Sequence, residues 1–161
     1  VRETFDAYRL QLDDNRFEHH LRIDPDLPPI EADRNAISQI IVNLISNVVK
    51  YCQDDRYLAI EVTSDTRRDR RGVLISVHDR GIGIAPEDRR HLFDGFFRAD
   101  DVRVRQRGGT GLGLALVKHI VDAHEGSLDV ESRLVKGTTF RIFLPAARRG
   151  AGAPASEGRS G

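Results

Sequence analysis

A glycine-rich run that leads into an apolar segment is the part of the chain best suited to chemistry. It reads GGTGLGLALV from Gly108 to Val117. Glycines let backbone N–H groups approach an anion closely, and the free N–H groups and aligned peptide dipoles at a helix start favour negative charge. The run predicts a phosphate site, although tight turns and close helix packing also produce such glycines.

A polar stripe follows one edge of a helix predicted from Asp33 to Tyr51, for which Asp33 is a suitable cap. Asn43, Asn47 and Lys50 form this stripe beside an apolar one. An Asn oxygen is a neutral ligand for Mg²⁺, and Lys can meet the phosphates that the ion bridges. Taken alone, the three residues fit an ordinary solvated helix face better. The face predicted to be buried has helical spacing and comprises Ile37, Ile40, Ile41, Leu44, Ile45 and Val48.

A predicted strand from Val73 ends in the acid Asp79, which is followed by Gly81 and Gly83. A carboxylate in this position can accept a hydrogen bond from an exocyclic amine such as that of adenine. Taken singly, the segment is explained better as a strand followed by a glycine turn, with Asp79 as a local cap.

The order and spacing of these segments resemble those of the sensor histidine kinases, from about Val1 to Pro145. Their N, G1, F and G2 boxes are matched by Asn43-x-x-x-Asn47-x-x-Lys50-Tyr51, Asp79-x-Gly81-x-Gly83, Leu92-Phe93-x-x-Phe96-Phe97-Arg98 and Gly109-Thr110-Gly111-Leu112-Gly113-Leu114. The resemblance implies an α/β fold, a two-layer sandwich with a mixed sheet and helices on one face. This is the Bergerat-type ATP-binding fold of the gyrase/Hsp90/histidine kinase/MutL superfamily, whose cofactors are ATP and Mg²⁺.

The same resemblance implies a role for each matched residue. Asn47 would bind Mg²⁺, Asn43 would support the metal and phosphate region, and Lys50 would contact phosphate. Asp79 would read the adenine amine. The other residues assigned to the nucleotide site are Tyr51, Gly81, Gly83 and Thr138 around the base, and Gly109, Thr110, Gly111, Leu112 and Gly113 at the phosphates. Phe97 and Arg98 join the site from the F box, where Arg98 and the nearby Arg103, Arg105 and Arg107 either contact phosphate or are solvated.

The implied reaction is transfer of the γ-phosphate of Mg-ATP to a histidine on a dimerisation domain outside this chain. No histidine here lies in the His-Glu/Asp-x-x-x-Pro context of a phosphoacceptor, so the isolated domain is expected to lack autophosphorylation. A receiver domain of a response regulator and a homodimeric parent kinase are the implied partners. Two alternatives stay open. One is an ATP-hydrolysing or serine-kinase relative, which usually has Glu where Asn43 stands, and the other is a degenerate nucleotide-binding module.

Composition fits one domain and excludes other classes. The 161 residues, 39% of them hydrophobic, predict a single domain over 1–147 and a disordered tail over 148–161. The 25 basic and 25 acidic residues balance, which disfavours binding to nucleic acid. No apolar run is long enough for membrane insertion. One cysteine and no signal peptide suit the cytoplasm, with a parent that is free or anchored in the inner membrane. The absence of Met implies that Val1 is not a natural start.

The remaining segments predict further elements. A first helix contains Phe5 to Leu12, and the strand from Phe17 to Ile23 alternates. A turn with four arginines, Arg67, Arg68, Arg70 and Arg71, is expected to be a solvated hairpin tip between strands 58–63 and 73–79. Residues 86–92 predict a short helix, 99–110 a mobile lid, and 128–132 and 138–144 the closing strands. The last helix is predicted to end at Gly126 and to bury Leu112, Ala115, Leu116, His119, Ile120 and Ala123.

Overall fold

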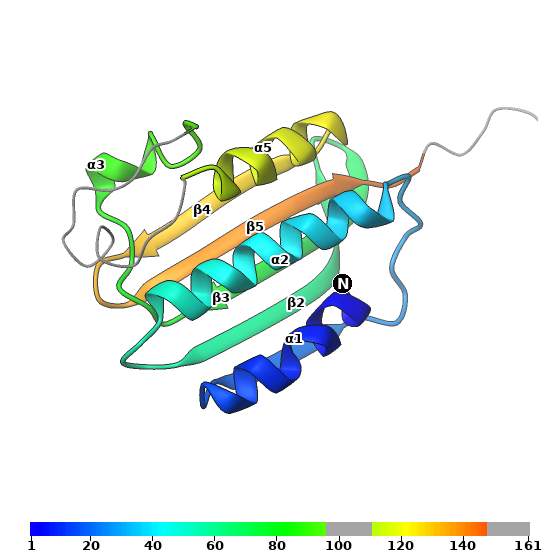
Figure 1. Cartoon of the computed structure of the whole chain (residues 1–161). Helices are drawn as coiled ribbons and strands as arrows, with labels where there is room; N and C mark the ends of the chain where they lie inside the picture. Colours follow the sequence, from blue (N-terminus) through cyan, green and yellow to red (C-terminus); the bar gives the residue numbers. More distant parts are fainter. Residues whose placement is uncertain (96–110, 148–161) are drawn as a thin grey trace, which may run out of the picture.

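The computed structural model, which describes residues 1–95 and 111–147, has a mixed sheet of five strands in the order β1-β2-β3-β5-β4 (Figure 1). Strands β1 and β2 are parallel and form one edge of the sheet, and all other neighbouring strands are antiparallel. The strand bounds are Glu18–Ile23 for β1, Tyr57–Arg67 for β2, Arg70–Asp79 for β3, Ser127–Arg133 for β4 and Gly137–Pro145 for β5.

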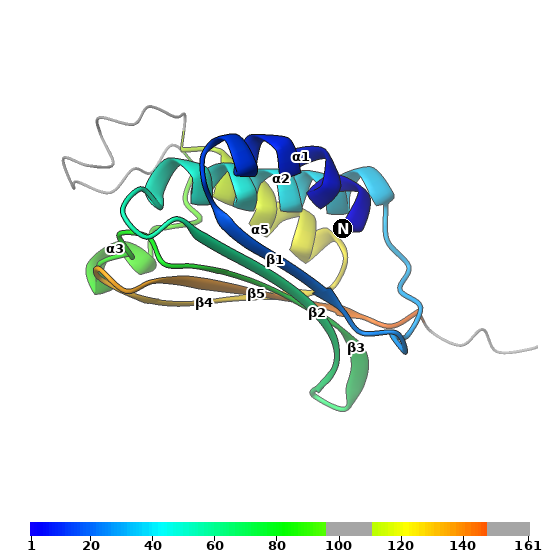
Figure 2. The same cartoon turned by 90° about the horizontal axis from the view of Figure 1, so that it is seen from below.

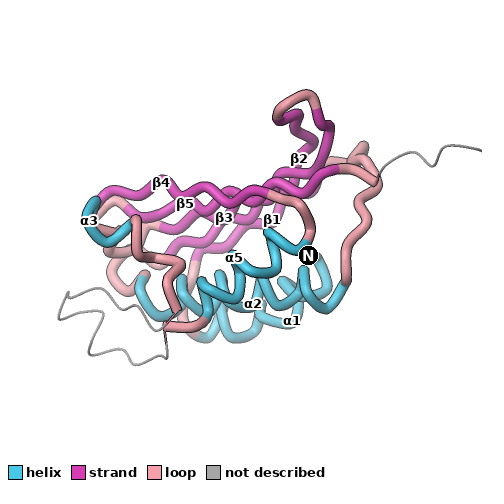
Figure 3. Tube along the Cα trace, turned by 90° about the horizontal axis from the view of Figure 1, so that it is seen from above, coloured by secondary structure: helices cyan, strands magenta, loops and turns pink. Residues whose placement is uncertain are grey.

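The long helices α1 (Arg2–Asp14), α2 (Arg34–Tyr51) and α5 (Gly113–Ala123) all lie on one face of this sheet (Figures 2 and 3). Within residues 1–95 and 111–147, the opposite face carries no helix. This two-layer α/β arrangement confirms the predicted fold class. In the described part of the chain, no helix is long and apolar enough to cross a membrane.

Helix α2, predicted from Asp33 to Tyr51, forms with nearly these bounds and lies between α1 and α5 in the helical layer (Figure 1). Its cap is Asp33, whose carboxylate accepts a hydrogen bond from the Ala36 N–H at 2.8 Å. Such a cap satisfies an N–H group that otherwise has no partner at a helix start. The six aliphatic residues of the predicted face are all buried, so the other edge of α2, with its two Asn residues, is held in a fixed direction.

Helix α5 faces the sheet with a different side from the predicted one. The side chains of Leu112 and Leu116, expected inside, are 41% and 40% exposed, whereas Val117, Ile120 and Val121 are buried. The predicted stripe is therefore only partly correct: Ile120 is buried as predicted, whereas Leu112, Leu116, His119 and Ala123 are exposed. This helix is apolar around most of its circumference, so sequence periodicity does not decide which side packs against the strands.

The end of α5 also differs from the prediction by one residue. The left-handed position after the helix belongs to Glu125, with φ of 53°, rather than to a glycine. The Glu125 N–H donates to Asp122 O at 3.0 Å and the Gly126 N–H to Val121 O at 2.9 Å, which is the hydrogen-bond pattern of a Schellman motif. The Glu125 carboxylate lies 3.1 Å from Arg70 of β3, an ion pair that joins the two elements.

The hairpin between β2 and β3 is longer than predicted and its arginines are not all solvated. Only Arg68 and Asp69 form the turn, with φ of 48° and 62°. The Arg67 guanidinium lies 5.6 Å from the centre of the Phe143 ring and is paired with Asp129 of β4. The prediction of a solvated hairpin tip is thus wrong for Arg67, which covers an aromatic ring on the helix-free face.

Three further predictions concern the short helix after β3, the lid and the C-terminal tail. Helix α3 (Pro86–Arg89) begins at a proline as predicted but ends three residues earlier than the expected 86–92. The lid predicted at 99–110 and the tail predicted at 148–161 lie outside the described residues, so both stay predictions.

Candidate functional site

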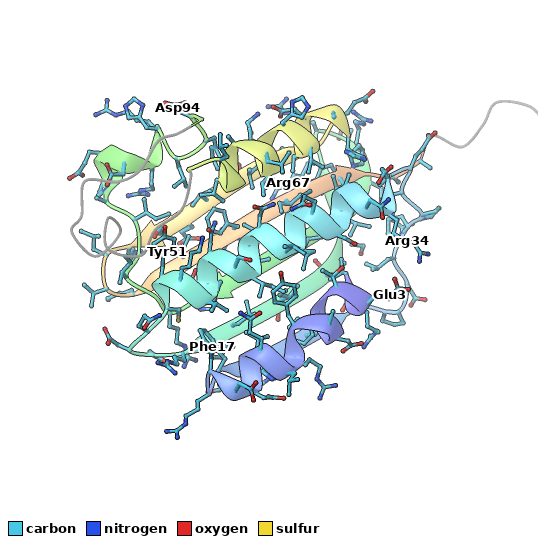
Figure 4. All side chains as sticks on the ribbon, in the orientation of Figure 1. Glu3, Phe17, Arg34, Tyr51, Arg67 and Asp94 are labelled. Atoms are coloured by element: carbon cyan, nitrogen blue, oxygen red, sulfur yellow. The ribbon has the colours of Figure 1, made fainter. Side chains whose placement is uncertain are left out.

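Predicted site residues from three parts of the fold meet at one end of the molecule. These parts are the C-terminal half of α2, the start of α5, and the end of the sheet at which β3 ends and β5 begins. Figure 4 labels Tyr51 at this end of α2. The Tyr51 carbonyl accepts a hydrogen bond from Ile82 N–H at 3.2 Å. Asp79 and Thr138 are paired neighbours on β3 and β5. Residues far apart in the sequence are thereby brought to one place.

Asn43 connects α2 to the start of α5. Its amide nitrogen donates to the Gln39 carbonyl at 2.8 Å, which fixes the side chain along the helix. Its amide oxygen faces the first residue of α5, because a Cβ atom built on Gly113 would lie 2.7 Å from that oxygen. A glycine at position 113 therefore lets the two helices approach closely here.

Asn47 and Lys50 continue the same edge of α2. Asn47 is half-buried and Lys50 is exposed. Within 1–95 and 111–147, neither side chain has a hydrogen bond or an ion pair with another residue. Those ranges also hold no cluster of three or more His, Cys, Asp or Glu residues that could bind a metal. A metal at this edge would need the Asn47 amide oxygen together with oxygens from a ligand, a hard donor set that suits Mg²⁺.

Asp79 is the buried acid of the site, with 8% of its surface exposed. Its Oδ1 accepts a hydrogen bond from the Gly81 N–H at 2.7 Å. Burial raises the pKa of the Asp79 carboxyl above its ordinary value, although the N–H groups of Gly81 and Thr138 favour the ionised form. A ligand amine that donated to this carboxylate would further stabilise its charge.

The loop after Asp79 is pressed between two other segments. A Cβ atom on Gly81 would lie 2.8 Å from the Tyr51 carbonyl oxygen, and one on Gly83 would lie 2.1 Å from the Arg133 carbonyl oxygen. Gly83 also has φ of 69°, a conformation that disfavours larger residues. Both glycines are thus required by the close packing of this loop against α2 and the β4–β5 turn.

Ser132, which the sequence did not single out, ties the same loop to the sheet. Its hydroxyl accepts a hydrogen bond from the Ile84 N–H at 2.8 Å and donates to the Gly137 carbonyl at 3.0 Å. The Thr138 hydroxyl lies 2.8 Å from it, and both side chains are buried. A serine near the end of a strand carries no distinctive sequence signal, so only the fold reveals this role.

The start of α5 is the third part of the candidate site, and it lies next to Asn43 of α2. Gly111 has φ of 72°, and Leu112, at the cap position, has no polar side chain that could satisfy the first N–H groups. Such a helix start favours an anion. Of the other predicted phosphate and lid contacts, Phe97, Arg98, Gly109 and Thr110 lie outside the described residues.

Comparison with known proteins gives matches over most of the chain. The model of the family described as histidine kinase-, DNA gyrase B- and HSP90-like ATPase matches residues 32–148. The sensor histidine kinase WalK of Bacillus subtilis is 39% identical over 132 residues, which are 80% of this chain and 21% of WalK. The sensor-like histidine kinase SenX3 of Mycobacterium tuberculosis is 43% identical over 116 residues, 71% of this chain and 27% of SenX3. The chain thus spans about a fifth to a quarter of these relatives.

Solved structures share the fold. The mycobacterial sensor histidine kinase MprB superposes with a TM-score of 0.71 at 25% identity, covering 89% of this chain and 90% of that one. Full-length ShkA in complex with AMPPNP gives a TM-score of 0.71 at 28% identity, over 91% of this chain and 30% of ShkA.

Proposed function

The chain belongs to the family of histidine kinase-, DNA gyrase B- and HSP90-like ATPases, and on this premise we propose that it binds Mg-ATP and transfers the γ-phosphate to a histidine. Its relatives are sensor histidine kinases, of which it corresponds to the ATP-binding catalytic domain. The relatives are several times longer, so the complete reaction belongs to a parent kinase.

The observation that carries the proposal is the juxtaposition of the buried acid Asp79 with the start of α5, which has no side-chain cap. Asp79 would accept a hydrogen bond from the 6-amino group of adenine, with Tyr51 packed on the base and Thr138 supporting it through water. The N–H groups from Gly111 to Gly113 would receive the phosphates. One Mg-ATP molecule can satisfy both ends because they flank the same half of α2. Binding of AMPPNP, an ATP analogue, to the structurally similar ShkA supports this assignment.

The edge of α2 would hold the metal between those two ends. Asn47 would ligate Mg²⁺, Asn43 would support the metal and phosphate region, and Lys50 would contact phosphate. Phosphoryl transfer depends on positioning and on neutralising charge, which these groups can do without a covalent step on the protein. A Mg²⁺ ion held by Asn47 would supply positive charge that stabilises the transferred phosphate.

The accepting histidine would lie on a dimerisation domain outside this chain, in a homodimeric parent, and a receiver domain of a response regulator would take the phosphate next. Asn43 supports transfer to a protein rather than to water, because an amide cannot remove a proton from water as a carboxylate can. ATP and receiver domains are cytoplasmic, so we assign the domain to the cytoplasm whether or not its parent is anchored in the inner membrane.

The outer face of α5, formed by Leu112, Leu116, His119 and Ala123, is a suitable docking surface for that dimerisation domain. All four side chains are exposed, and two of them are large and apolar. An acceptor histidine must come in line with the γ-phosphate, and this face begins at the residues proposed to bind the phosphates. A domain docked there would bring its histidine to the correct end of the nucleotide.

Incubation of the domain with γ-labelled ATP, with and without the dimerisation helices of its parent, tests the proposal. We expect slow hydrolysis alone, and acid-labile, base-stable label on the helices when they are added. The Asp79→Asn variant should lose the label. Rapid steady hydrolysis would support the gyrase-like alternative, phosphoserine on a partner the serine-kinase alternative, and no transfer to matched helices a degenerate module. Any of these three results would overturn the proposal.

A further inference from the structure

A cluster of rings and charges lies on the helix-free face of the sheet, directly behind the acid of the nucleotide site. Side chains alternate along β3, so His78 and Arg80 point away from the face on which Asp79 lies. The register pairs Leu58 with Asp79, which brings Arg80, one residue past the end of β3, next to Tyr57. His78 and Arg80 of this cluster therefore flank Asp79 in the sequence but lie on the other face of the sheet.

Arg80 is held at two points within this cluster. Its guanidinium carbon lies 3.8 Å from the centre of the Tyr57 ring, well within the range of a cation–π contact. Its Nη1 lies 3.7 Å from the Asp55 carboxylate. The Tyr57 ring is itself flanked by His20 and His78, each with a centroid distance of 5.7 Å.

This anchor lies between the acid and the residue whose N–H orients it. Asp79 precedes Arg80, and Gly81, whose N–H holds the Asp79 Oδ1 at 2.7 Å, follows it. The chain leaves the sheet at Arg80 and enters the loop that contains Gly81 and Gly83, whose far part is packed against Arg133 and bonded to Ser132. The Arg80 guanidinium, held against Tyr57 and Asp55, adds a restraint at the other end of this loop, where it leaves the strand.

We propose that Arg80, held against Tyr57 and Asp55 on the helix-free face, is a positioning residue that keeps the Asp79 carboxylate aimed at the adenine amine and so sets the preference for adenine. This inference rests on the proposed ATP site and deepens it. Arg80 itself touches no nucleotide in this proposal. It acts through the Gly81 N–H and the backbone of β3, and its loss weakens base reading without weakening phosphate binding.

The test compares ATP with purine riboside triphosphate, which lacks the 6-amino group, by calorimetry on the wild-type domain and its variants. The affinity ratio of the two nucleotides reports the amine contact alone. We expect the wild-type domain to prefer ATP by about tenfold or more. Arg80→Ala should lower that ratio by roughly three- to tenfold, and Tyr57→Leu should lower it similarly. Arg80→Lys, which keeps a cation against the ring, should give an intermediate ratio.

Two controls separate positioning from general stability. Arg22→Ala removes an arginine on the same face that is 65% exposed and lies on β1, and it should leave the ratio unchanged. In an Asp79→Asn background, Arg80→Ala should lower the ratio no further, because it acts through the missing carboxylate. Melting temperatures of all variants identify any that fail to fold.

The contradictory outcomes are distinct. An unchanged affinity ratio in folded Arg80→Ala would overturn this inference alone. If both nucleotides lost affinity equally, Arg80 would be assigned to phosphate binding or general stability. A folded wild-type domain that bound neither nucleotide would overturn the proposed function and this inference with it.

Discussion

The two ends of the candidate site are built differently. At the adenine end, formed by Asp79, Gly81, Ser132 and Thr138, the polar groups are mostly buried and bonded to one another. At the phosphate end, formed by Asn47, Lys50 and the start of α5, side chains are half-buried or exposed and the helix has no side-chain cap. The first end is thus formed before a ligand arrives, whereas at the second the side chains of Asn47 and Lys50 have no partner in the described part of the chain.

This difference explains how one site can combine selectivity with reactivity. Fixed groups discriminate between bases because a wrong base leaves buried polar atoms without partners. Groups that bind a transferred phosphate must instead release the phosphoryl group to the acceptor and then release ADP. The following variants are expected to separate the two ends, from the largest effect to the smallest.

The largest effect is expected from Asp79→Asn at the adenine end. The change turns one acceptor oxygen into a donor that faces the adenine amine, so ATP binding should weaken by about 1–3 kcal/mol. Adenosine binding should weaken by a similar amount, because the contact is to the base. Calorimetry with both ligands measures this, and an unchanged ATP affinity would remove Asp79 from the site.

A matched pair of truncations compares the stability of the two ends. Ser132→Ala leaves the part-buried Ile84 N–H and the buried Gly137 carbonyl without this partner, so the free energy of unfolding should fall by about 1–3 kcal/mol. Asn47→Ala removes an amide that has no side-chain partner within residues 1–95 and 111–147, so it should change this free energy by less than about 0.5 kcal/mol, while Mg-ATP should bind more weakly. Urea unfolding of both variants provides the measurement. Equal losses of stability would contradict the proposed contrast.

The adenine end should also be sensitive to pH. Burial raises the pKa of Asp79 above its ordinary value of 3.8, so the ionised carboxylate reduces stability at neutral pH and this cost lessens as the pH falls through the raised pKa. ATP needs the ionised form as its acceptor. Its affinity should therefore fall on acidification, beginning above pH 3.8. ATP titrates in the same experiment, so Asp79→Asn serves as the reference, and identical pH profiles would contradict the assignment.

The smallest effect is expected from Gly113→Ala at the phosphate end. The new methyl group would lie 2.7 Å from the Asn43 amide oxygen, so this side chain must shift from the position that its hydrogen bond to Gln39 gives it. Stability should change by less than about 1 kcal/mol, since alanine favours the helix. Mg-ATP should bind a few-fold more weakly while adenosine binds as before. Equal weakening of both ligands would show that the two ends are not separate.

The sequence predicted α2 well and α5 poorly, for a physical reason. The apolar residues of α2 form one stripe, so periodicity defines its buried face. Helix α5 also has leucines on its outer face, and Leu116 at 40% exposure is explained by a partner outside this chain in the proposed function rather than by packing. The types and order of the candidate site residues were recognisable as boxes of a known family.

Contacts between distant segments were not predictable. Arg67 was expected to be solvated, but it packs on Phe143 from another strand. Ser132 joins the site only because β4 and β5 bring it beneath the loop after Asp79. Glu125 adopts a left-handed conformation next to Arg70, which local sequence does not indicate. These features depend on tertiary packing rather than on spacing along the chain.

The most direct test of the account is an NMR titration of the ¹⁵N-labelled domain, first with adenosine and then with Mg-AMPPNP. Adenosine should shift the amide signals around Asp79, Gly81 and Thr138 and leave those from Gly111 to Gly113 unchanged. The triphosphate should then shift the signals of Gly111 to Gly113 as their N–H groups bind phosphate. Unchanged signals at the start of α5 in the presence of bound Mg-AMPPNP would contradict the claim that this helix start receives the phosphates.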